Sequence, residues 1–521
     1  MIAESDKMNK SANKSAESGK KITRRDFVRG GAYAILGAAA AGIFSEFLPG
    51  QAADISAGKA GQDNKNIKNI KSADLTSVKD MTSPSITRDM SKCIGCGKCV
   101  EICSGRQGLD ILELVEENGA AVSRLKYADD LSKSKCIGCG QCARHCPSGA
   151  IAVRDGLATV SAAMRNQKYK YIAWQFAPSA QHIIGEEFRN LTGADMSRKI
   201  AAAVRALGEK NLAFSTDFGA DMTIMEEATE FVNYYKTGDK NNKKPFMTSC
   251  CPGWVNYAEI YAPEILKNLS SCKSPMEMLG SLIKSYLPEK LGVKASEIFH
   301  VAVMPCTAKK YERARDEMLT DGVRTVDAVL TVIEFKNLLV SKGIDLASLQ
   351  DAEYDSIFSG TSGAGRIFGA TGGVCEAAMR TAYYIITGQE PPEIQFAELR
   401  GNDGIKTAEI KINNNIIRAC VVNGIANIKN IIQDIKNGVC EYDFIEVMAC
   451  RGGCSGGGGT PVLFADESIR HRGLYQYDAS SAISSSHHNQ VLSDIYSAYL
   501  KSPCSEIAEE LLHTSYYARE L

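Results

Sequence analysis

The pattern of hydrophobic and polar residues divides the chain into two parts. Up to about residue 84 there is no regular hydrophobic period, apart from one apolar run at residues 31–48. From residue 169 onward, short apolar strands alternate with helical patterns, which is typical of an α/β domain with mainly parallel sheets. The run Tyr171-Ile-Ala-Trp-Gln-Phe176 predicts one of these strands, and Ala177-Pro178-Ser179 predicts the turn that ends it.

A helix is predicted at residues 224–235, after the segment 217–223. Glu227 and Glu230 are three residues apart on this helix and therefore share a face. Two carboxylates on one helical face usually interact only with solvent. They can also relay protons, because a carboxyl oxygen accepts a hydrogen bond and, when protonated, donates one.

The first 53 residues have the features of an export signal. Residues 1–22 are polar and rich in Lys and Ser, Arg24 and Arg25 precede the apolar run, and small residues follow it at 51–53. The paired arginines indicate the twin-arginine route. The alternative is a membrane anchor, which the shortness and glycine content of the apolar run disfavour. Residues 54–84, rich in Lys, Asn, Ser and Ala, predict a flexible, solvated linker.

Residues 85–155 contain two runs of four cysteines with the spacing C-x2-C-x2-C-x3-C. The double run resembles that of bacterial ferredoxins with two [4Fe–4S] clusters, in which the fourth cysteine of each run binds the other cluster. One cluster is therefore expected to use Cys93, Cys96, Cys99 and Cys146. The other is expected to use Cys136, Cys139, Cys142 and Cys103. Zinc is the alternative for paired cysteines, but each run here has four rather than two.

This region departs from a minimal ferredoxin in two ways. Ser104 stands where the pattern has proline, which can loosen the turn but removes no ligand. The interval 104–135 is longer than usual and predicts an extra hairpin.

The composition is that of a large folded chain with metal sites. Its 521 residues suggest three or four domains, and 44% hydrophobic residues can form a large core. The net charge of −1 argues against nucleic-acid binding. The 18 cysteines are too clustered for a disulfide scaffold. Five cysteines outside the clusters are expected to be buried as small hydrophobic residues: Cys272, Cys375, Cys420, Cys440 and Cys504.

Three later segments carry the remaining five cysteines. They are Thr248-Ser-Cys-Cys-Pro-Gly-Trp254, Met304-Pro-Cys-Thr-Ala-Lys-Lys310 and Glu446-Val-Met-Ala-Cys-Arg-Gly-Gly-Cys454. Their glycines and prolines allow the backbone to turn sharply and approach a bulky inorganic group. Four thiolates are enough to hold one [4Fe–4S] cube. In order and spacing, the segments resemble the signature of the iron-only ([FeFe]) hydrogenases, and the resemblance extends from about Cys93 to the C-terminus.

The resemblance implies an H-cluster, in which a [4Fe–4S] cube is joined to a diiron unit that carries carbonyl, cyanide and a bridging dithiolate. The expected cube ligands are Cys251, Cys306, Cys450 and Cys454, of which Cys454 is shared with the diiron unit. Cys250 is expected to be the unligated thiol that transfers protons, and Lys309 is expected to donate to a cyanide.

The resemblance also implies a proton path and a lining for the cofactor. The path would run from Cys250 through Glu227, Ser270 and Glu230 to solvent. The residues expected around the cofactor are Ala177, Pro178, Ser179, Met304, Met448, Ser274 and Phe368. Ser274 is also expected to cap the helix that begins at Pro275. Cys375 and Arg451 depart from the residues common in relatives, but neither is an expected ligand.

Five regions are therefore expected. A twin-arginine signal (1–53) and a linker (54–84) precede an α+β ferredoxin-like domain (85–155). An α/β catalytic domain follows (156–464), and then a mostly helical tail (465–521) that resembles the small subunit of the family. The tail is expected to wrap around the main domain, without a second metal site.

The expected activity is the reversible oxidation of dihydrogen, with electrons relayed through the cube and two further [4Fe–4S] clusters. The signal implies the periplasm or the outer face of the cytoplasmic membrane, with at most peripheral membrane contact. Hydrogen uptake there would supply electrons to a c-type cytochrome, a ferredoxin or another partner, and dedicated maturases would insert the diiron unit. The alternative is a non-catalytic relative, either an iron–sulfur assembly factor or a hydrogen sensor. A simple ferredoxin would leave the five later cysteines unexplained.

Overall fold

The computed structural model describes residues 78–188, 192–237, 245–462 and 468–520. The expected signal and residues 54–77 of the expected linker lie outside these ranges. Within them, every helix is either too short or too polar to cross a membrane.

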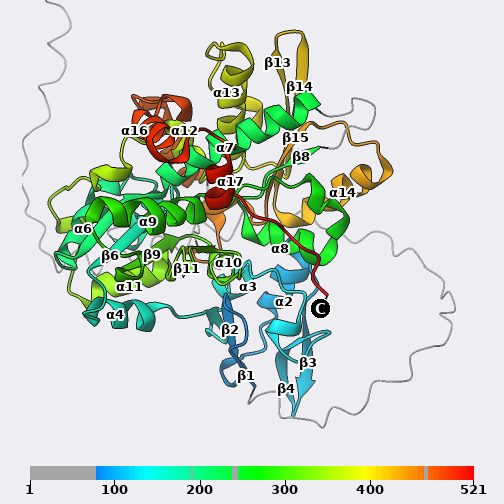
Figure 1. The fold of residues 1–521 in the computed structure, drawn as a ribbon. Helices are drawn as coiled ribbons and strands as arrows, with labels where there is room; N and C mark the ends of the chain where they lie inside the picture. Colours follow the sequence, from blue (N-terminus) through cyan, green and yellow to red (C-terminus); the bar gives the residue numbers. More distant parts are fainter. Residues whose placement is uncertain (1–77, 189–191, 238–244, 463–467, 521) are drawn as a thin grey trace, which may run out of the picture. The chain divides into compact units, whose positions relative to one another are not determined.

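The ferredoxin-like region consists of a small antiparallel sheet, a hairpin and short helices (Figure 1). The sheet has the order β1 (Lys79–Asp80), β2 (Ile86–Asp89) and β5 (Ile151–Val153). The hairpin pairs β3 (Leu112–Glu117) with β4 (Ala120–Leu125), and the helices include α2 (Lys98–Val100) and α3 (Gln141–Arg144). The predicted extra hairpin is thus present. Its turn is Asn118-Gly119, and both residues have positive φ, as a tight hairpin turn requires.

The expected linker was extended too far toward the C-terminus. Lys79 and Asp80 pair with Asp89 and Arg88 in the sheet, and the Asp80 carboxylate accepts a hydrogen bond from the Leu131 N–H at 2.8 Å. The strand is only two residues long, which is too short to produce a hydrophobic period in the sequence.

The first large sheet has four parallel strands in the order β12-β9-β6-β7. They are β6 (Tyr171–Phe176), β7 (Asn211–Ser215), β9 (Ile298–Met304) and β12 (Ala328–Thr331). The predicted strand at 171–176 coincides with β6. All seven residues of β9 are buried, as expected for a central strand covered on both faces.

The second large sheet has the order β13-β14-β15-β8. Its strands are β8 (Phe246–Met247), β13 (Ile405–Ile412), β14 (Asn415–Asn423) and β15 (Phe444–Met448). The pairs β14–β15 and β15–β8 are parallel, whereas β13 and β14 form an antiparallel hairpin. The sheets of this domain are therefore mainly parallel, with one antiparallel pair at an edge.

Helices surround these sheets. The longer ones are α4 (Leu157–Arg165), α6 (Ser197–Ala206), α7 (Thr216–Thr237), α8 (Pro252–Tyr261), α9 (Pro275–Leu291), α11 (Val332–Ser341), α13 (Gly373–Thr387) and α14 (Ile428–Asn437). The predicted start of α7 was wrong, because the helix begins at Thr216, directly after β7, rather than near residue 224. Its first turns are buried on all sides, so they show no amphipathic period.

The tail is mostly helical, as expected. It contains α15 (Ser468–Ser480), α16 (Gln490–Ile495), the π-helical turn η14 (Tyr496–Leu500) and α17 (Glu506–Leu512). α17 packs against α9 (Figure 1). A buried ion pair between Arg380 and Asp478, with the nitrogen and oxygen 2.8 Å apart, attaches α15 to α13.

The five extra cysteines are only partly as predicted. Cys272, Cys375 and Cys420 are buried, but Cys440 and Cys504 are only partly buried. Both of these lie in loops, where the local packing is not visible as a pattern in the sequence.

Candidate active site and metal centres

The three cysteine segments meet because each follows a parallel strand. Cys250 and Cys251 follow β8, Cys306 follows β9, and Cys450 follows β15. Ligands of open α/β sheets bind outside the carboxyl ends of their strands. The segments from both large sheets enclose a single cavity there, and the turn after β6 closes it. The cavity is lined by Ala177, Pro178, Ser179, Thr216, Cys250, Cys251, Pro252, Pro275, Met276, Met304, Pro305, Cys306, Lys309, Phe368, Gly369, Met448 and Cys454.

The four expected cube cysteines are close enough to influence one another's ionisation. Burial raises the pKa of the Cys306 thiol, and the neighbouring thiols of Cys251 and Cys454 raise it further. Burial likewise raises the pKa of Cys450, next to Cys306 and Cys251. Four buried thiols held close together favour a cationic inorganic group, because binding of iron removes their protons.

The cavity also has polar groups that a cofactor with acceptor atoms would satisfy. The Ser179 hydroxyl is buried and has no hydrogen-bond partner in the described structure. Lys309 lies on the same cavity and donates to the Cys250 carbonyl at 3.2 Å. A buried donor without a partner is costly, so the Ser179 hydroxyl fits a bound acceptor such as a cyanide ligand, and the Lys309 ammonium adds a donor of positive charge on the same cavity. The donor set therefore fits an H-cluster.

Lys309 carries a charge despite its burial. Burial acts to lower the pKa of its ammonium, but the Glu312 carboxylate at 2.7 Å and the thiols of Cys306 and Cys250 raise that pKa above its ordinary value. The cavity therefore contains a fixed positive charge.

Cys250 and Glu227 are buried neighbours at the inner end of the expected proton path. Burial raises the pKa of the Cys250 thiol well above its ordinary value, and the charge of Glu227 raises it further. Burial, together with the charge of Glu230, raises the pKa of Glu227 to about 8. Neither Glu227 oxygen has a hydrogen bond of good geometry, although the Ser270 hydroxyl and the Ser249 N–H lie near it.

Ser270 and Glu230 continue from Glu227 in the expected order. The Ser270 hydroxyl donates to Glu230 Oε2 at 2.7 Å, and the Ser271 N–H donates to Glu230 Oε1 at 2.9 Å. Ser270 and Glu227 are fully buried, whereas Glu230 is only partly buried. The structure thus brings the four residues together in a series that leads outward from the cavity.

The cysteines of the ferredoxin-like region are grouped in the crossed arrangement. Cys93, Cys96, Cys99 and Cys146 line one small cavity. Cys103 lies near Cys136 and Cys139, whose charges add to burial in raising its pKa to about 12. Sulfurs around one zinc ion would lie roughly 4 Å apart. In the described part of the chain, three groups of potential metal ligands have their ligand atoms within 4.8 Å of one another. None of these groups contains any of the twelve cluster cysteines. Their spacing therefore favours clusters over zinc.

The second cysteine run packs directly on the cube segments. Gln141 Nε2 donates to the Gly456 carbonyl at 2.7 Å, and Thr307 Oγ1 donates to the Gly138 carbonyl at 2.7 Å. A Cβ atom on Gly458 would lie 2.2 Å from the Cys139 carbonyl oxygen, so only glycine allows this approach. The group of Cys136, Cys139, Cys142 and Cys103 is therefore the one beside the cube cysteines.

Comparison with known proteins decides the family. The model of the iron-only hydrogenase large subunit, C-terminal domain, matches residues 170–458. The iron hydrogenase small subunit model matches 468–519, and a 4Fe–4S dicluster domain matches 92–150. The chain belongs to the [FeFe] hydrogenases.

Relatives of the chain include enzymes of this family. The NADP-reducing hydrogenase subunit HndD of Solidesulfovibrio fructosivorans is 39% identical, over 84% of this chain and 75% of that protein. Iron hydrogenase 1 of Clostridium pasteurianum is 40% identical, over 85% of this chain and 78% of that protein. An [FeFe]-hydrogenase structure from Chlamydomonas reinhardtii matches with a TM-score of 0.62 and 33% identity, over 70% of this chain and 99% of that chain.

A different class of protein is also similar. The cytosolic iron-sulfur assembly component 3 of Bos taurus is 30% identical, over 70% of this chain and 77% of that protein. The scaffold thus occurs in both classes, but the enzymes above have the higher identity. This chain is accordingly an iron-only hydrogenase, an oxidoreductase with iron–sulfur clusters.

Six of the seven predicted lining residues of the hydrogenase line the cavity; Ser274 does not. Ser274 does precede α9, but its hydroxyl makes no capping hydrogen bond and is buried without a partner. Ser104 donates to the Val100 carbonyl at 2.8 Å inside the π-helical turn η3 (Glu101–Arg106). Arg451 is exposed and does not line the cavity.

Sequence reasoning missed Glu446 as a residue of the site. Its buried carboxylate accepts from the Gly372 N–H at 2.7 Å and the Cys375 N–H at 2.8 Å, so it fixes the start of α13 beside the cavity. Its position at the head of the third segment was the available signal. Thr216 and Met276, which also line the cavity, had no signal in the sequence.

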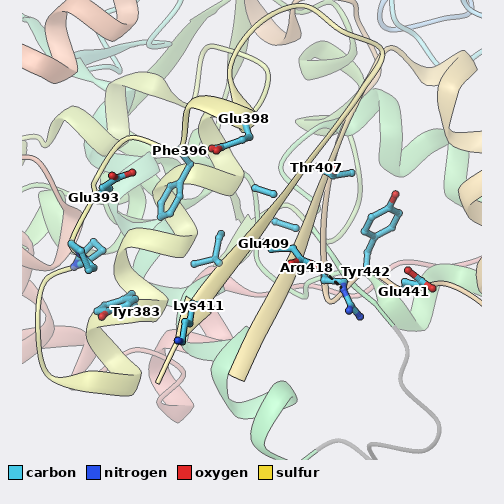
Figure 2. A pocket seen from close by; sticks show the side chains of 15 residues that line it. Tyr383, Glu393, Phe396, Glu398, Thr407, Glu409, Lys411, Arg418, Glu441 and Tyr442 are labelled. Atoms are coloured by element: carbon cyan, nitrogen blue, oxygen red, sulfur yellow. Dashed lines mark hydrogen bonds and ion pairs between the residues drawn. The ribbon is translucent and has the colours of Figure 1, made fainter. Parts of the chain in front are cut away.

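A second, open cavity lies between the end of α13 and the β13–β14 hairpin (Figure 2). Its lining mixes aromatic and charged side chains, such as Tyr383, Phe396 and Lys411, and contains no cysteine. Glu409 and Arg418 form an exposed ion pair across it, with the nitrogen and oxygen 3.2 Å apart. It lacks the buried ionisable groups that mark the cysteine cavity.

Proposed function

We propose that this hydrogenase catalyses the reversible oxidation of dihydrogen and transfers protons through Cys250, Glu227, Ser270 and Glu230. The observation that carries the proposal is the location of Cys250. Its thiol lines the cavity of the cube cysteines and also adjoins Glu227, the first member of the series that leads outward.

Cys251, Cys306, Cys450 and Cys454 would hold the cube, with Cys454 shared with the diiron unit. When bound, this group supplies the site at which dihydrogen is converted to two protons and two electrons. The protein binds the cofactor, orients it and supplies the electrostatics around it. Lys309 and Ser179 would donate hydrogen bonds to its anionic ligands, while Met304, Phe368 and Met448 exclude water.

Proton transfer requires groups that can both accept and donate. A Cys250 thiol is neutral in this cavity, so it donates its proton toward Glu227 and is re-protonated from the cavity side. Glu227 has a pKa of about 8, so both its protonated and its ionised forms are accessible near neutral pH. The Ser270 hydroxyl then links Glu227 to Glu230.

Two further [4Fe–4S] clusters would supply the electron-transfer sites between the active site and the partner. Cys136, Cys139, Cys142 and Cys103 would hold one of them, in the loop that packs beside the cube cysteines. Cys93, Cys96, Cys99 and Cys146 would hold the other, on the side of the partner, because Cys96 is exposed.

Location and direction are part of the proposal. The paired Arg24 and Arg25 before an apolar run support export by the twin-arginine route to the periplasm or the outer membrane face. Hydrogen uptake there would reduce a c-type cytochrome or a ferredoxin-like partner, after maturases have inserted the diiron unit. Protein-film electrochemistry tests the direction, and a strong bias toward proton reduction would contradict uptake.

The test of the activity is hydrogen oxidation with a viologen dye, on anaerobic protein reconstituted with the diiron cofactor. Cys250→Ala is expected to abolish turnover with unchanged iron content. Cys440→Ala, outside every cluster, serves as the matched control and should retain the parent rate. An inactive parent with full cofactor loading and infrared bands of carbonyl and cyanide would instead favour a sensor or assembly role.

A further inference from the structure

The end of the tail lies against the outer end of the proposed proton path. His513 forms a β-bridge with Cys272, and the Thr514 N–H donates to the Ser271 carbonyl at 2.7 Å. The Lys273 N–H donates to the Leu512 carbonyl at 2.8 Å on the other side of the bridge. These backbone bonds fix the His513 ring next to Ser271.

Ser271 connects Glu230 to His513. Its hydroxyl lies 2.9 Å from Glu230 Oε1 and 2.7 Å from His513 Nδ1. The hydroxyl has one hydrogen and two neighbours that can accept it. A proton that reaches Glu230 therefore has a hydrogen-bonded connection to an imidazole.

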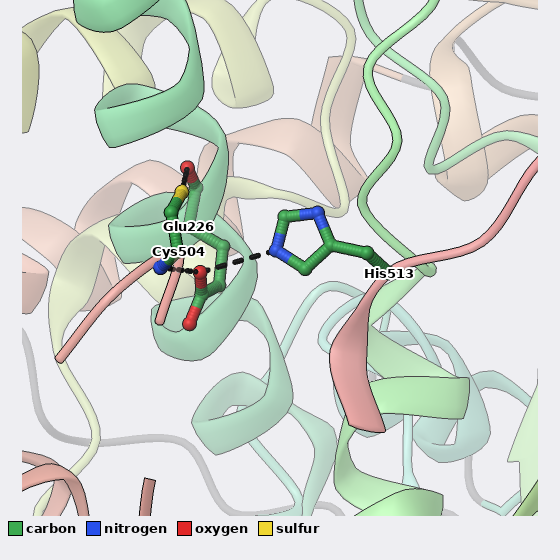
Figure 3. Close-up of side chains that lie close together, drawn as sticks. All are labelled: Glu226, Cys504 and His513. Carbon is green, nitrogen blue, oxygen red and sulfur yellow. Dashed lines mark hydrogen bonds and ion pairs between the residues drawn. The ribbon is translucent and has the colours of Figure 1, made fainter. Parts of the chain in front are cut away.

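The opposite nitrogen of His513 faces a second carboxylate. His513 Nε2 lies 3.2 Å from Glu226 Oε2 (Figure 3). Glu226 also accepts from the Tyr496 hydroxyl and from the Cys504 N–H, each at 2.6 Å. The imidazole therefore lies between two hydrogen-bonding partners, the Ser271 hydroxyl at Nδ1 and the Glu226 carboxylate at Nε2.

The backbone before His513 indicates that the tail is held in place by these contacts. Lys501 and Cys504 both have left-handed φ angles, of 72° and 55°. Non-glycine residues rarely adopt this conformation, and it persists only where the surroundings impose it. In this turn, the surroundings are the hydrogen bonds from Cys504 to Glu226.

We propose that His513 is the proton-exchanging group between Glu230 and solvent, so that the small-subunit-like tail takes part in proton transfer. The inference rests on the proposed function and extends its proton path. During hydrogen oxidation, protonated Glu230 gives its proton to Ser271 Oγ while the Ser271 hydroxyl proton moves to His513 Nδ1. One O–H bond breaks at Glu230, one N–H bond forms at His513, and Ser271 is unchanged. The resulting imidazolium, paired with Glu226, releases the proton through the small part of its side chain, 8%, that is exposed.

The first test is steady-state hydrogen oxidation by the reconstituted holoenzyme. His513→Gln keeps a hydrogen-bonding side chain that cannot titrate. Turnover should fall about 100-fold, the lower end of the range for a lost acid–base group, because the partly buried Glu230 can still exchange protons with solvent directly. The KM for hydrogen should not change. His488→Gln, on a histidine whose side chain is 48% exposed, is the matched control and should retain the parent rate.

Rescue separates proton exchange from a structural role. Added imidazole should restore turnover of His513→Ala, with no gain for the parent or for Cys250→Ala. If the His513→Gln variant oxidised hydrogen at the same rate as the parent, the proposal would be overturned. Loss without rescue, accompanied by a lower melting temperature in both His513 variants, would show that the residue only holds the tail in place.

Two further measurements test the role of His513 independently of the activity and rescue assays. In ¹⁵N-histidine NMR of the full chain, which has seven histidines, the signal missing in His513→Gln identifies His513. Ser271→Ala should shift the tautomer equilibrium of the His513 ring, and an unchanged signal would refute the coupling even if the parent proved inactive.

His513 also belongs to two groups of potential metal ligands whose atoms lie within 4.8 Å of one another. One group contains Glu226 and Cys504, and the other contains Glu230 and Cys272. Zn²⁺ should therefore inhibit the parent about tenfold more strongly than His513→Gln, and equal inhibition would count against the assignment.

Discussion

Replacement of Glu227 by glutamine should change how the stability of the protein depends on pH. Glu227 is fully buried, and neither of its oxygens has a hydrogen-bond partner in the described structure. Burial and the charge of Glu230 raise its pKa from 4.5 to about 8. The folded state therefore prefers the neutral acid. Its contribution to stability is complete below pH 4.5 and is lost as the pH rises through about 8.

The size of the effect follows from that pKa. A change from 4.5 to about 8 corresponds to roughly 5 kcal/mol in the free energy of unfolding, at 1.36 kcal/mol per pH unit. This figure is an upper limit, since the site can relax around the charge. A neutral glutamine at 227 has no such dependence. Glu227→Gln should therefore resemble the parent at pH 5 and be more stable by a few kcal/mol above pH 8.

The assay is the apparent melting temperature at a fixed scan rate, for protein with its [4Fe–4S] clusters alone, at pH 5 to 9. A fixed rate is needed because unfolding of a cluster protein is irreversible. Glu409→Gln, whose carboxylate is 63% exposed, is the control and should follow the parent. Parallel curves for Glu227→Gln and the parent would refute the reasoning. In the holoenzyme, the same substitution should lower turnover by about 10²- to 10⁴-fold, because glutamine cannot exchange protons.

Three further substitutions test other parts of the structure. Cys96→Ser should abolish electron transfer to a protein partner while leaving the infrared bands of the diiron unit unchanged. Gly458→Ala should lower the rate of dye reduction by the enzyme. The added Cβ would lie 2.2 Å from the Cys139 carbonyl oxygen, so the loops of two clusters would have to move apart. Gly105→Ala is the control and should keep the parent rate, because open space surrounds Gly105. Arg380→Met should destabilise the fold by about 3–5 kcal/mol, measured by thermal unfolding, because it removes the closer cationic partner of the buried Asp478 and leaves only Arg400, at 3.5 Å.

The sequence predicted those parts of the fold that depend on local pattern. Strand β6 coincides with the run 171–176, and the hairpin was predicted from the length of the interval 104–135. The start of α7 was missed, because a helix covered on all sides has no polar face to show. The segment 217–223 was placed before the helix, although it forms the first turns of α7. In the fold, Asp217 pairs with Arg366 at 2.6 Å, far along the sequence.

In the candidate site, only the residues indicated by cysteine spacing or by resemblance to the family could be predicted. The cysteine segments lie where parallel strands end, which the strand pattern implies. Glu446 stands at the head of the third segment, but its role, like that of His513, depends on contacts with residues more than 70 positions away. The tail was expected to serve only for wrapping, because its sequence showed no sign of a second metal site.

The buried carboxylates of the described structure show why Glu227 differs from its neighbours. Asp221 is also fully buried, but it accepts from the Ser362 N–H, the Ser362 and Ser486 hydroxyls and the Asn489 amide, and its pKa rises only to about 6. Glu227 lacks such bonds, and its pKa rises to about 8. Added donors would stabilise the fold, yet they would hold Glu227 in its ionised form. The missing hydrogen bonds therefore lower stability but keep Glu227 able to give up and take back a proton near neutral pH.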